Sequence, residues 1–300
     1  MTDCNLCPRK CGVNRTLQKG FCGTGDKLIL AKAMLHKWEE PCISVKNGAG
    51  AVFFSGCNLH CCYCQNNSIS NLTYGIEVSV EKLADIFLML QHKGADNIEL
   101  VTPTHFVPLI IKSLDLVKPQ LKIPVIYNTS GYELPETIRS LKGYVDVYLP
   151  DLKYFSPEAS ARYSNADDYF KFASESILEM VSQTGKPVFG KDGAIIRGTI
   201  IRHLVLPTLR HDSMKIMKWI SENIPLDSVL VSVMCQYTPL DFIPDKYSEI
   251  KRRVTKMEYN SVVNYSAELG LKGFCQQQNS SSEKYVPDFD LSGILNGDAF

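Results

Sequence analysis

The chain has 300 residues, of which 45% are hydrophobic and 21% are charged, a composition typical of a globular protein with a full hydrophobic core. Its 32 Lys and Arg residues balance 32 Asp and Glu residues, so there is no overall positive charge for non-specific binding to nucleic acids or membrane surfaces. The first residues, MTDCNLCPRKCG, lack the apolar run of a signal peptide, and no later stretch of about 18 apolar residues indicates a membrane-spanning helix. These features predict a cytoplasmic protein without a membrane partner and argue against a nucleic-acid partner.

Residues 1–48 form a predicted cysteine-rich N-terminal region. Four of its cysteines have the spacing C-x2-C-x3-C-x10-C, and they are Cys4, Cys7, Cys11 and Cys22. In a reducing compartment cysteines bind metals or catalyse reactions more often than they form disulfides. Four thiolates can also enclose a metal centre in a segment that is too short for a hydrophobic core of its own. The spacing therefore predicts a metal site and leaves open whether it holds a structural zinc ion or a second [4Fe-4S] cluster.

Residues 49–275 alternate between short apolar runs and amphipathic stretches with a helical period. The predicted strands cover residues 50–56, 97–102, 123–129, 145–153, 194–207 and 228–237, and the predicted helices cover residues 79–94, 106–117, 134–143, 157–184, 213–224 and 248–270. Such alternation indicates βαβ units and a parallel sheet. Because six units are too few for a closed eight-fold barrel, the pattern predicts an α/β fold of the partial (β/α)6 barrel type. We expect residues 276–300 to form a polar linker followed by a short apolar segment that packs back.

The loop after the first predicted strand reads GCNLHCCYCQNN and contains four cysteines. Cys57, Cys61 and Cys64 are spaced C-x3-C-x2-C. Three thiolates can hold three irons of a [4Fe-4S] cluster and leave the fourth iron open to a substrate or cofactor. One alternative is a zinc site that uses His60 and Cys62, and another is that Cys62 replaces Cys61 as a ligand. The aromatic Tyr63 directly before the third cysteine favours Cys61.

The motif and its place in the fold resemble the radical S-adenosylmethionine (SAM) superfamily, whose hallmark is C-x3-C-x-aromatic-C after the first strand of a partial barrel. The resemblance covers residues from about 50 to 275. Within the superfamily, the stretches FFSGCNLHCCYCQN, DLK and IRHLVLP are similar to homologues of the pyruvate formate-lyase activating enzyme. The resemblance implies a [4Fe-4S] cluster and SAM as cofactors, and an electron donor such as flavodoxin or ferredoxin. It also implies an oxidoreductase that cleaves SAM reductively to a 5′-deoxyadenosyl radical for hydrogen abstraction.

The resemblance further implies cofactor contacts at the carboxyl ends of the strands, beginning with Tyr63 in the cysteine loop. The family's second strand usually ends in a Gly-Gly-Glu-Pro type stretch, where this chain reads ELVTPTH. That difference keeps Thr102 and Thr104 as candidates but removes the glycines that allow close approach of the backbone to SAM. Thr104 could instead cap a helix. Whether this stretch contacts SAM stays open here.

The third and fourth predicted strands add Asn128, Thr129, Asp151 and Lys153. Asp151 and Lys153 are alternate residues that face one side of a strand, where their charges suit the sulfonium and carboxylate of SAM. The alternative is a salt bridge at the rim of the barrel.

The next strand carries Arg202 and His203, which point to opposite faces, so only one of them can enter the barrel. We choose His203 as the SAM contact.

The function that these features favour is a radical SAM enzyme that acts on a protein partner, as an activating enzyme of a glycyl radical enzyme does. Alternative substrates are a peptide, a metabolite or an RNA. The non-catalytic alternative is an iron-sulfur protein that transfers electrons without cleaving SAM. The sequence assigns no catalytic residue, no physiological substrate, no oligomeric state and no role to Cys42 or Cys62.

Overall fold

The computed structural model describes residues 3–71, 74–276 and 286–295. The strands are β1 (Leu28–His36), β2 (Ala49–Phe54), β3 (Ile76–Val78), β4 (Ile98–Val101), β5 (Val125–Thr129), β6 (Val147–Pro150), β7 (Val188–Phe189), β8 (Ile195–Leu204), β9 (Leu230–Met234) and β10 (Gly273–Cys275). The α-helices are α1 (Asn67–Ser70), α2 (Val80–His92), α3 (Val107–Val117), α4 (Pro135–Ser140), α5 (Pro157–Ser164), α6 (Tyr169–Thr184), α7 (Arg210–Asn223) and α8 (Lys256–Glu268). Two 3-10 helices are η1 (Thr104–Phe106) and η2 (Asp245–Ile250).

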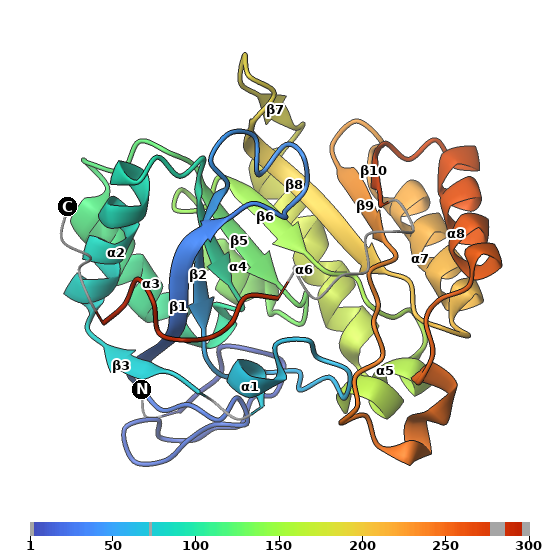
Figure 1. Cartoon of the computed structure of the whole chain (residues 1–300), viewed down its shortest axis with the longest axis horizontal. Coiled ribbons are helices and arrows are strands. Elements are labelled where there is room, and N and C mark those ends of the chain that lie inside the picture. The colour runs from blue at the N-terminus through green and yellow to red at the C-terminus, as the bar shows by residue number, and fades with distance from the viewer. Residues whose placement is uncertain (1–2, 72–73, 277–285, 296–300) are drawn as a thin grey trace.

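The strands form one sheet in the order β10-β9-β8-β6-β5-β4-β2-β1-β3, and β7 pairs with β8 (Figure 1). Every neighbouring pair from β2 to β10 is parallel, whereas β1 pairs antiparallel with both β2 and β3. All residues of β2, β4, β5 and β6 are buried, as expected for parallel strands that are covered on both faces. The sheet does not close on itself. The predicted α/β fold with an open parallel sheet is confirmed, and a partial barrel agrees with it.

The side chains of each strand alternate between the two faces of the sheet, and each face has its own apolar core. Helices cover the face with the larger core (Figure 1). Val52, Leu100, Tyr127 and Ile201 belong to the core beneath the helices. Helix α2 begins at the predicted N-cap, where the Ser79 side chain accepts a hydrogen bond from the Lys82 amide at 3.1 Å.

The concave face has a smaller core, which a loop from the N-terminal region fills. Cys42 and Ile43 pack there against inward-facing strand residues, including Ala49, Ile126 and Leu149. This apolar layer lies toward the amino ends of the parallel strands, so space for ligands is left at their carboxyl ends.

Two predicted helices are each broken in the structure. The stretch 157–184 forms α5 and α6, because Asn165 ends α5 in a left-handed conformation with φ of 51°. The stretch 248–270 forms part of η2 and then α8, which starts only at a capping box made by Thr255 and Glu258. Residues 28–36, which belong to the predicted N-terminal region, form β1 in the same sheet as the barrel strands.

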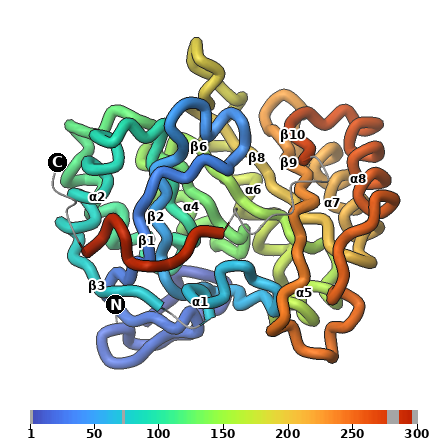
Figure 2. The backbone as a smooth tube through the Cα atoms, viewed as in Figure 1, coloured from blue at the N-terminus to red at the C-terminus, as the bar shows by residue number. Residues whose placement is uncertain are grey.

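The described residues near the two ends of the chain pack on the sheet, but they contribute no strand to its parallel part. Residues 3–27 contain no helix or strand and lie at the end of β2 where the cysteine loop begins. Near the C-terminus, the Ala33 amide donates to the Ser292 carbonyl and the Leu291 amide donates to the Ala31 carbonyl, so residues 286–295 cross β1 (Figure 2). This agrees with the expectation that an apolar segment of the tail packs back.

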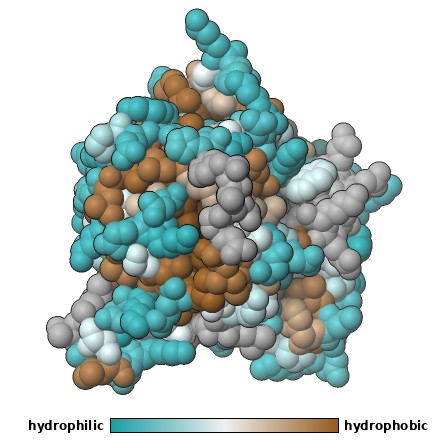
Figure 3. Space-filling model, turned by 60° about the vertical axis from the view of Figure 1, so that its left-hand side comes forward, coloured by the Kyte–Doolittle hydropathy of each residue, from teal (hydrophilic) through white to brown (hydrophobic). Residues whose placement is uncertain are grey.

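In the view of Figure 3, hydrophobic residues gather in the middle of the face and hydrophilic residues form most of its outline. In the part of the chain that the structure describes, no helix combines the length and the apolar character needed to cross a bilayer.

We expect that Gly56→Ala destabilises the protein much more than Gly143→Ala. Both glycines have a left-handed backbone, with φ of 89° and 81°, so each substitution carries a cost of about 1 kcal/mol for that conformation. A Cβ on Gly56 would lie 2.5 Å from the Cys22 carbonyl oxygen, whereas a Cβ on Gly143 would meet nothing within 4 Å. The overlap should cost at least about 2 kcal/mol more, measured as the difference in unfolding free energy in urea. Equal losses would contradict the close packing of the cysteine loop on the N-terminal region.

Candidate active site

A cavity of about 220 Å³ lies at the carboxyl ends of the parallel strands, and we call it the cluster cavity. Its walls come from the cysteine loop after β2 and from the ends of β4, β5, β6, β8 and β9. Of the residues that the sequence selects, the cavity is lined by Cys57, Cys61, Tyr63, Cys64, Thr102, Asn128, Thr129, Asp151 and Lys153. The fold therefore brings most of the predicted site together at one place.

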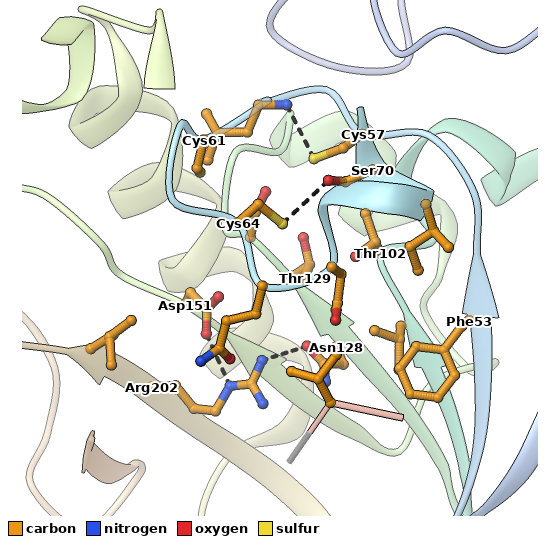
Figure 4. A pocket seen from close by; sticks show the side chains of 18 of the residues that line it. Phe53, Cys57, Cys61, Cys64, Ser70, Thr102, Asn128, Thr129, Asp151 and Arg202 are labelled. Atoms are coloured by element: carbon orange, nitrogen blue, oxygen red, sulfur yellow. Dashed lines mark hydrogen bonds and ion pairs between the residues drawn. The ribbon is translucent and has the colours of Figure 1, made fainter. Parts of the chain in front are cut away.

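The three motif cysteines are unpaired thiols that line the cavity together. Each sulfur also accepts a hydrogen bond. Cys57 accepts from the Leu59 amide at 3.3 Å and Cys64 from the Ser70 hydroxyl at 3.2 Å (Figure 4), and Cys61 accepts from the Ser164 hydroxyl at 3.0 Å. Donors aimed at sulfur stabilise thiolates, which are the form that binds iron.

The charge balance around these thiols also suits a bound metal cluster. Burial raises the pKa of the Cys57 and Cys61 thiols to about 11 and raises the pKa of Cys64 as well. The ammonium group of Lys153 opposes this effect by lowering the pKa of all three. A positively charged cluster core that binds the sulfurs would remove the cost of ionising them, so the residues fit the group.

Cys62 and His60, the other candidate ligands in this loop, do not line the cavity. The Cys62 amide donates to the Tyr163 carbonyl at 2.8 Å. The His60 ring is held by the Asn71 side chain at 2.5 Å and the Phe21 carbonyl at 3.0 Å. The structure therefore places Cys61, rather than Cys62, beside Cys57 and Cys64.

Tyr63 contributes its ring to the wall of the cavity. Its hydroxyl pairs with the Tyr154 hydroxyl at 2.6 Å, and its ring meets the Tyr237 ring edge-on with centroids 5.9 Å apart. These contacts hold the ring in place directly before Cys64.

A charged network faces the cysteines across the cavity (Figure 4). Lys153 Nζ lies 2.6 Å from Asp151 Oδ2, and Arg202 Nε lies 2.9 Å from Asp151 Oδ1. Burial opposes ionisation of Asp151, but the charges of Arg202 and Lys153 outweigh it and hold the pKa of the carboxyl below its usual value. The pair is mostly buried, with side-chain exposures of 16% and 15%, so it is not a salt bridge at an open rim.

Of the two candidates on β8, Arg202 lines the cavity and His203 does not. Its terminal Nη2 atom donates to Asn128 Oδ1 at 2.5 Å, while Asn128 Nδ2 donates to Glu99 Oε1 at 2.6 Å. His203 is 1% exposed, and its Nδ1 atom bonds to the Leu152 carbonyl at 2.6 Å on the helix-covered face. Of these two residues, Arg202 therefore lines the cavity and the predicted His203 does not, because adjacent strand residues face opposite sides.

Thr102 lines the cavity in a left-handed conformation, with φ of 59°. This conformation is rare for a residue other than glycine. The chain has thus kept a glycine-like backbone after β4 although the glycines of the family's stretch are absent.

Thr104 does not line the cavity, because it serves a buried carboxyl that the sequence analysis missed. Glu133 Oε1 accepts hydrogen bonds from the hydroxyls of Thr129, Thr104 and Tyr127 at 2.5, 2.6 and 3.2 Å. Burial raises the pKa of Glu133 to about 7. Thr104 also caps no helix, since the residue at the start of η1 is Pro103. The predicted candidate Thr104 therefore lies outside the cavity lining and donates to Glu133.

The four N-terminal cysteines lie near one another. A Cβ on Gly20 would lie 3.3 Å from the Cys11 sulfur and 3.6 Å from the Cys22 sulfur, so the bare glycine lets these two sulfurs approach. Burial raises the pKa of Cys4, the neighbouring Cys11 and Cys22 raise it further, and the Arg15 guanidinium lowers it.

Cys7 joins this group from the side of the cysteine loop. Burial, together with the charges of Glu133 and Cys22, raises the pKa of Cys7 to about 12. The N-terminal group reaches the cluster cavity through the backbone, because the Cys57 amide donates to the Cys22 carbonyl at 3.2 Å. Among residues 3–71, 74–276 and 286–295, no three His, Cys, Asp or Glu side chains are grouped as ligands of a single metal ion.

The sequence analysis also missed Glu39, which lines the cavity from the loop after β1. Glu39 Oε2 lies 3.4 Å from an Arg202 nitrogen, and Glu39 Oε1 lies 3.2 Å from His36 Nδ1. The only sequence signal was the pair of acidic residues in HKWEEP directly after an apolar run.

Comparison with known proteins identifies the family. A family model described as the Radical SAM superfamily matches residues 51–220. A protein of Methanocaldococcus jannaschii called Uncharacterized protein MJ0674 is 31% identical over 281 residues, which are 90% of this chain and 75% of that protein.

A solved structure shares the fold. The crystal structure of a radical SAM methyltransferase from Sphaerobacter thermophilus has a TM-score of 0.53 and 11% identity, and the match covers 75% of this chain. This chain spans 65% of the length of that methyltransferase, and the likeness concerns the fold alone. Since the superfamily model matches more than half of the residues, the chain belongs to the radical SAM superfamily.

Proposed function

We propose that this chain is an enzyme that holds a [4Fe-4S] cluster on Cys57, Cys61 and Cys64, binds SAM beside it, and cleaves SAM reductively for hydrogen abstraction from a substrate. Membership of the superfamily implies the cluster and SAM. The observation that carries the proposal is that the three sulfurs and the Asp151–Lys153 pair line one cavity at the carboxyl ends of the strands.

The residues of the chain supply binding, charge and exclusion of water. Asp151 and Lys153 offer one charge of each sign to a zwitterionic ligand with a sulfonium, and Arg202 fixes Asp151 in its ionised form. Apolar wall residues such as Phe53 and Leu59 keep water away from the thiols. When bound, the reduced cluster supplies the electron that splits SAM into methionine and a 5′-deoxyadenosyl radical.

The electron comes, in this proposal, from an external donor such as flavodoxin or ferredoxin. Such donors operate in reducing compartments, which agrees with the predicted cytoplasmic location.

Activation of a glycyl radical enzyme is a narrower candidate for the same site. The stretches that resemble pyruvate formate-lyase activating enzymes supply Phe53, Cys57, Asp151 and Arg202 to the cavity wall, which supports a shared SAM chemistry. In this proposal these residues bind cofactors, so they do not indicate which protein is the substrate. A glycyl radical detected by electron paramagnetic resonance would identify such a partner.

We also propose that Cys4, Cys7, Cys11 and Cys22 hold a second [4Fe-4S] cluster. Residues 3–27 lack helix and strand, yet three of these cysteines are at most 8% exposed, so a segment with little core of its own keeps its thiols buried. The iron-sulfur assembly that loads the Cys57 loop would load this neighbouring site as well.

We predict that replacing Cys57, Cys61 or Cys64 by Ala removes about four irons per chain from the anaerobically reconstituted protein, whereas Cys62→Ala removes none. The reason is that only the first three side chains line the cavity. Iron analysis and the broad absorption of the cluster in visible light measure the outcome. Loss of iron in Cys62→Ala together with retention in Cys61→Ala would overturn the ligand assignment.

Reduced, cluster-loaded protein is expected to convert SAM slowly to 5′-deoxyadenosine without a substrate, because cleavage needs only the cluster, SAM and an electron. Chromatography of the quenched reaction measures the product, and the Cys61→Ala protein is the control without the cluster of the Cys57 loop. A sample that carries reduced cluster and binds SAM, but forms no deoxyadenosine, would favour the electron-transfer protein.

The double variant Cys4→Ser with Cys7→Ser should lose about four irons and keep the iron of the Cys57 loop. Elemental analysis decides between the metals, with Cys62→Ala as a control for the loss of any thiol. Loss of about one zinc ion instead would replace the second cluster by a structural zinc site. No change in either metal would mean that these cysteines are not ligands.

A further inference from the structure

A second cavity, of about 450 Å³, adjoins the cluster cavity, and we call it the lateral cavity. It lies between residues 37–41 and the strands β8, β9 and β10, at the end of the sheet. The two cavities share wall residues, namely His36, Glu39, Arg202, Met234 and Gln236. A ligand in the lateral cavity would therefore lie next to the place proposed for SAM.

One buried carboxyl group in the lateral cavity, that of Glu40, has a hydrogen bond with the Ser232 side chain but keeps one oxygen without a partner. Glu40 is 8% exposed, and its Oε2 atom has no hydrogen-bond partner among the residues that the structure describes. Leaving a buried polar atom unpaired destabilises a protein, and a charged group more than a neutral one. Such a cost is expected where a ligand group completes the pairing.

Acidic groups outnumber the basic groups that could neutralise them here. Arg202 already contacts Asp151 at 2.9 Å and Glu39 at 3.4 Å. Glu99 lies behind them, is fully buried and has an unpartnered Oε2 atom. Burial raises the pKa of Glu40 and of Glu99, and repulsion by Glu39 adds to the rise in both.

The rest of the lateral cavity combines apolar and polar walls. Trp38, Met234 and Phe274 give it an apolar part, and Trp38 leaves 53% of its surface exposed. Ser232, Gln236 and Gln276 add polar side chains. Lys37 also lines it, but its side chain is exposed, so water screens its charge. Apolar surface with a few convergent polar groups is the usual construction of a small-molecule site.

We propose that the lateral cavity binds a small molecule with an ammonium or guanidinium group, which pairs with Glu40 while its apolar part packs on Trp38 and Phe274. A cation satisfies the free oxygen of Glu40 and offsets the charge of the neighbouring carboxylates. A carboxylate or phosphate in the same position would add repulsion. The role of this cationic ligand rests on the proposed function, because the wall that the two cavities share would place the ligand next to SAM.

The test uses agmatine, a compound with a guanidinium at one end and an ammonium at the other. It is titrated calorimetrically into reconstituted wild-type protein in saturating SAM, with 1,6-hexanediol and pimelate as neutral and anionic probes of similar length. We expect saturable binding of agmatine and at least tenfold weaker binding of both other probes. Pimelate or hexanediol binding as tightly as agmatine would overturn the proposal, as would no agmatine binding to cluster-loaded protein.

The variant Glu40→Gln should weaken agmatine binding about tenfold or more, because it removes the charge and keeps the shape. Glu222→Gln, which alters a 59% exposed side chain, is the matched control and should bind as the wild type does. Circular dichroism and iron content test whether the Glu40→Gln protein is folded. If it is not folded, the comparison of the three probes on the wild-type protein still tests the proposal.

Two further measurements separate this proposal from the proposed function. If SAM displaces agmatine competitively, the cation site belongs to SAM and the separate lateral site is refuted. Wild-type protein that forms deoxyadenosine but discriminates none of the probes would refute the cationic ligand and leave the proposed function intact. Protein that binds agmatine selectively but never cleaves SAM would refute the proposed function and leave the binding site.

Discussion

The buried guanidinium of Arg202 is the contact that joins the elements around both cavities. It reaches Asp151 after β6, Asn128 on β5 and Glu39 from the loop after β1. Three parallel strands and one N-terminal loop are thereby tied together in a place where each carboxylate would otherwise be buried without a counter-charge. A planar group with five donors can make these contacts at fixed angles, which the single ammonium of a lysine could not. The position of Asp151 in the cluster cavity, and with it that of Lys153, depends on this arrangement.

A second guanidinium, that of Arg9 in the N-terminal region, holds the cysteine loop in place by donating hydrogen bonds to backbone carbonyls. The Arg9 guanidinium donates to the carbonyls of Asn58, Ser164 and Asn165 at 2.8, 3.2 and 2.6 Å, and its face lies 4.0 Å from the centre of the Phe21 ring. One residue of the N-terminal region therefore connects the loop of Cys57 with the end of α5, which carries the hydroxyl that bonds to Cys61. Order in the first 25 residues and order in the cysteine loop are expected to depend on each other.

Local pattern predicted those parts of the molecule that depend on neighbouring residues, and it failed where contacts are distant in sequence. The alternation of strands and helices and the cysteine spacing are local, so the parallel sheet and the grouping of Cys57, Cys61 and Cys64 followed from them. Arg202 and His203 alternate in any strand, but which of them faces the concave side depends on register with Asp151. Glu39, Glu40 and Glu133 were missed because an acidic residue in a loop gives no signal of burial until the fold covers it.

The concave side of the sheet is organised in layers, and their order determines where a reaction can take place. Cys42 and Ile43 fill the layer toward the amino ends of the strands, so nothing larger than a side chain fits there. The middle layer holds the charged groups around Arg202, and the cysteine loop covers the carboxyl ends. Both cavities touch the middle layer, and they meet at Glu39 and Arg202. The lateral cavity lies on the side of β8, β9 and β10, whereas the cysteine loop lines only the cluster cavity. The open sheet thus offers two neighbouring spaces around Arg202, and a closed eight-stranded barrel with a packed interior could not do so.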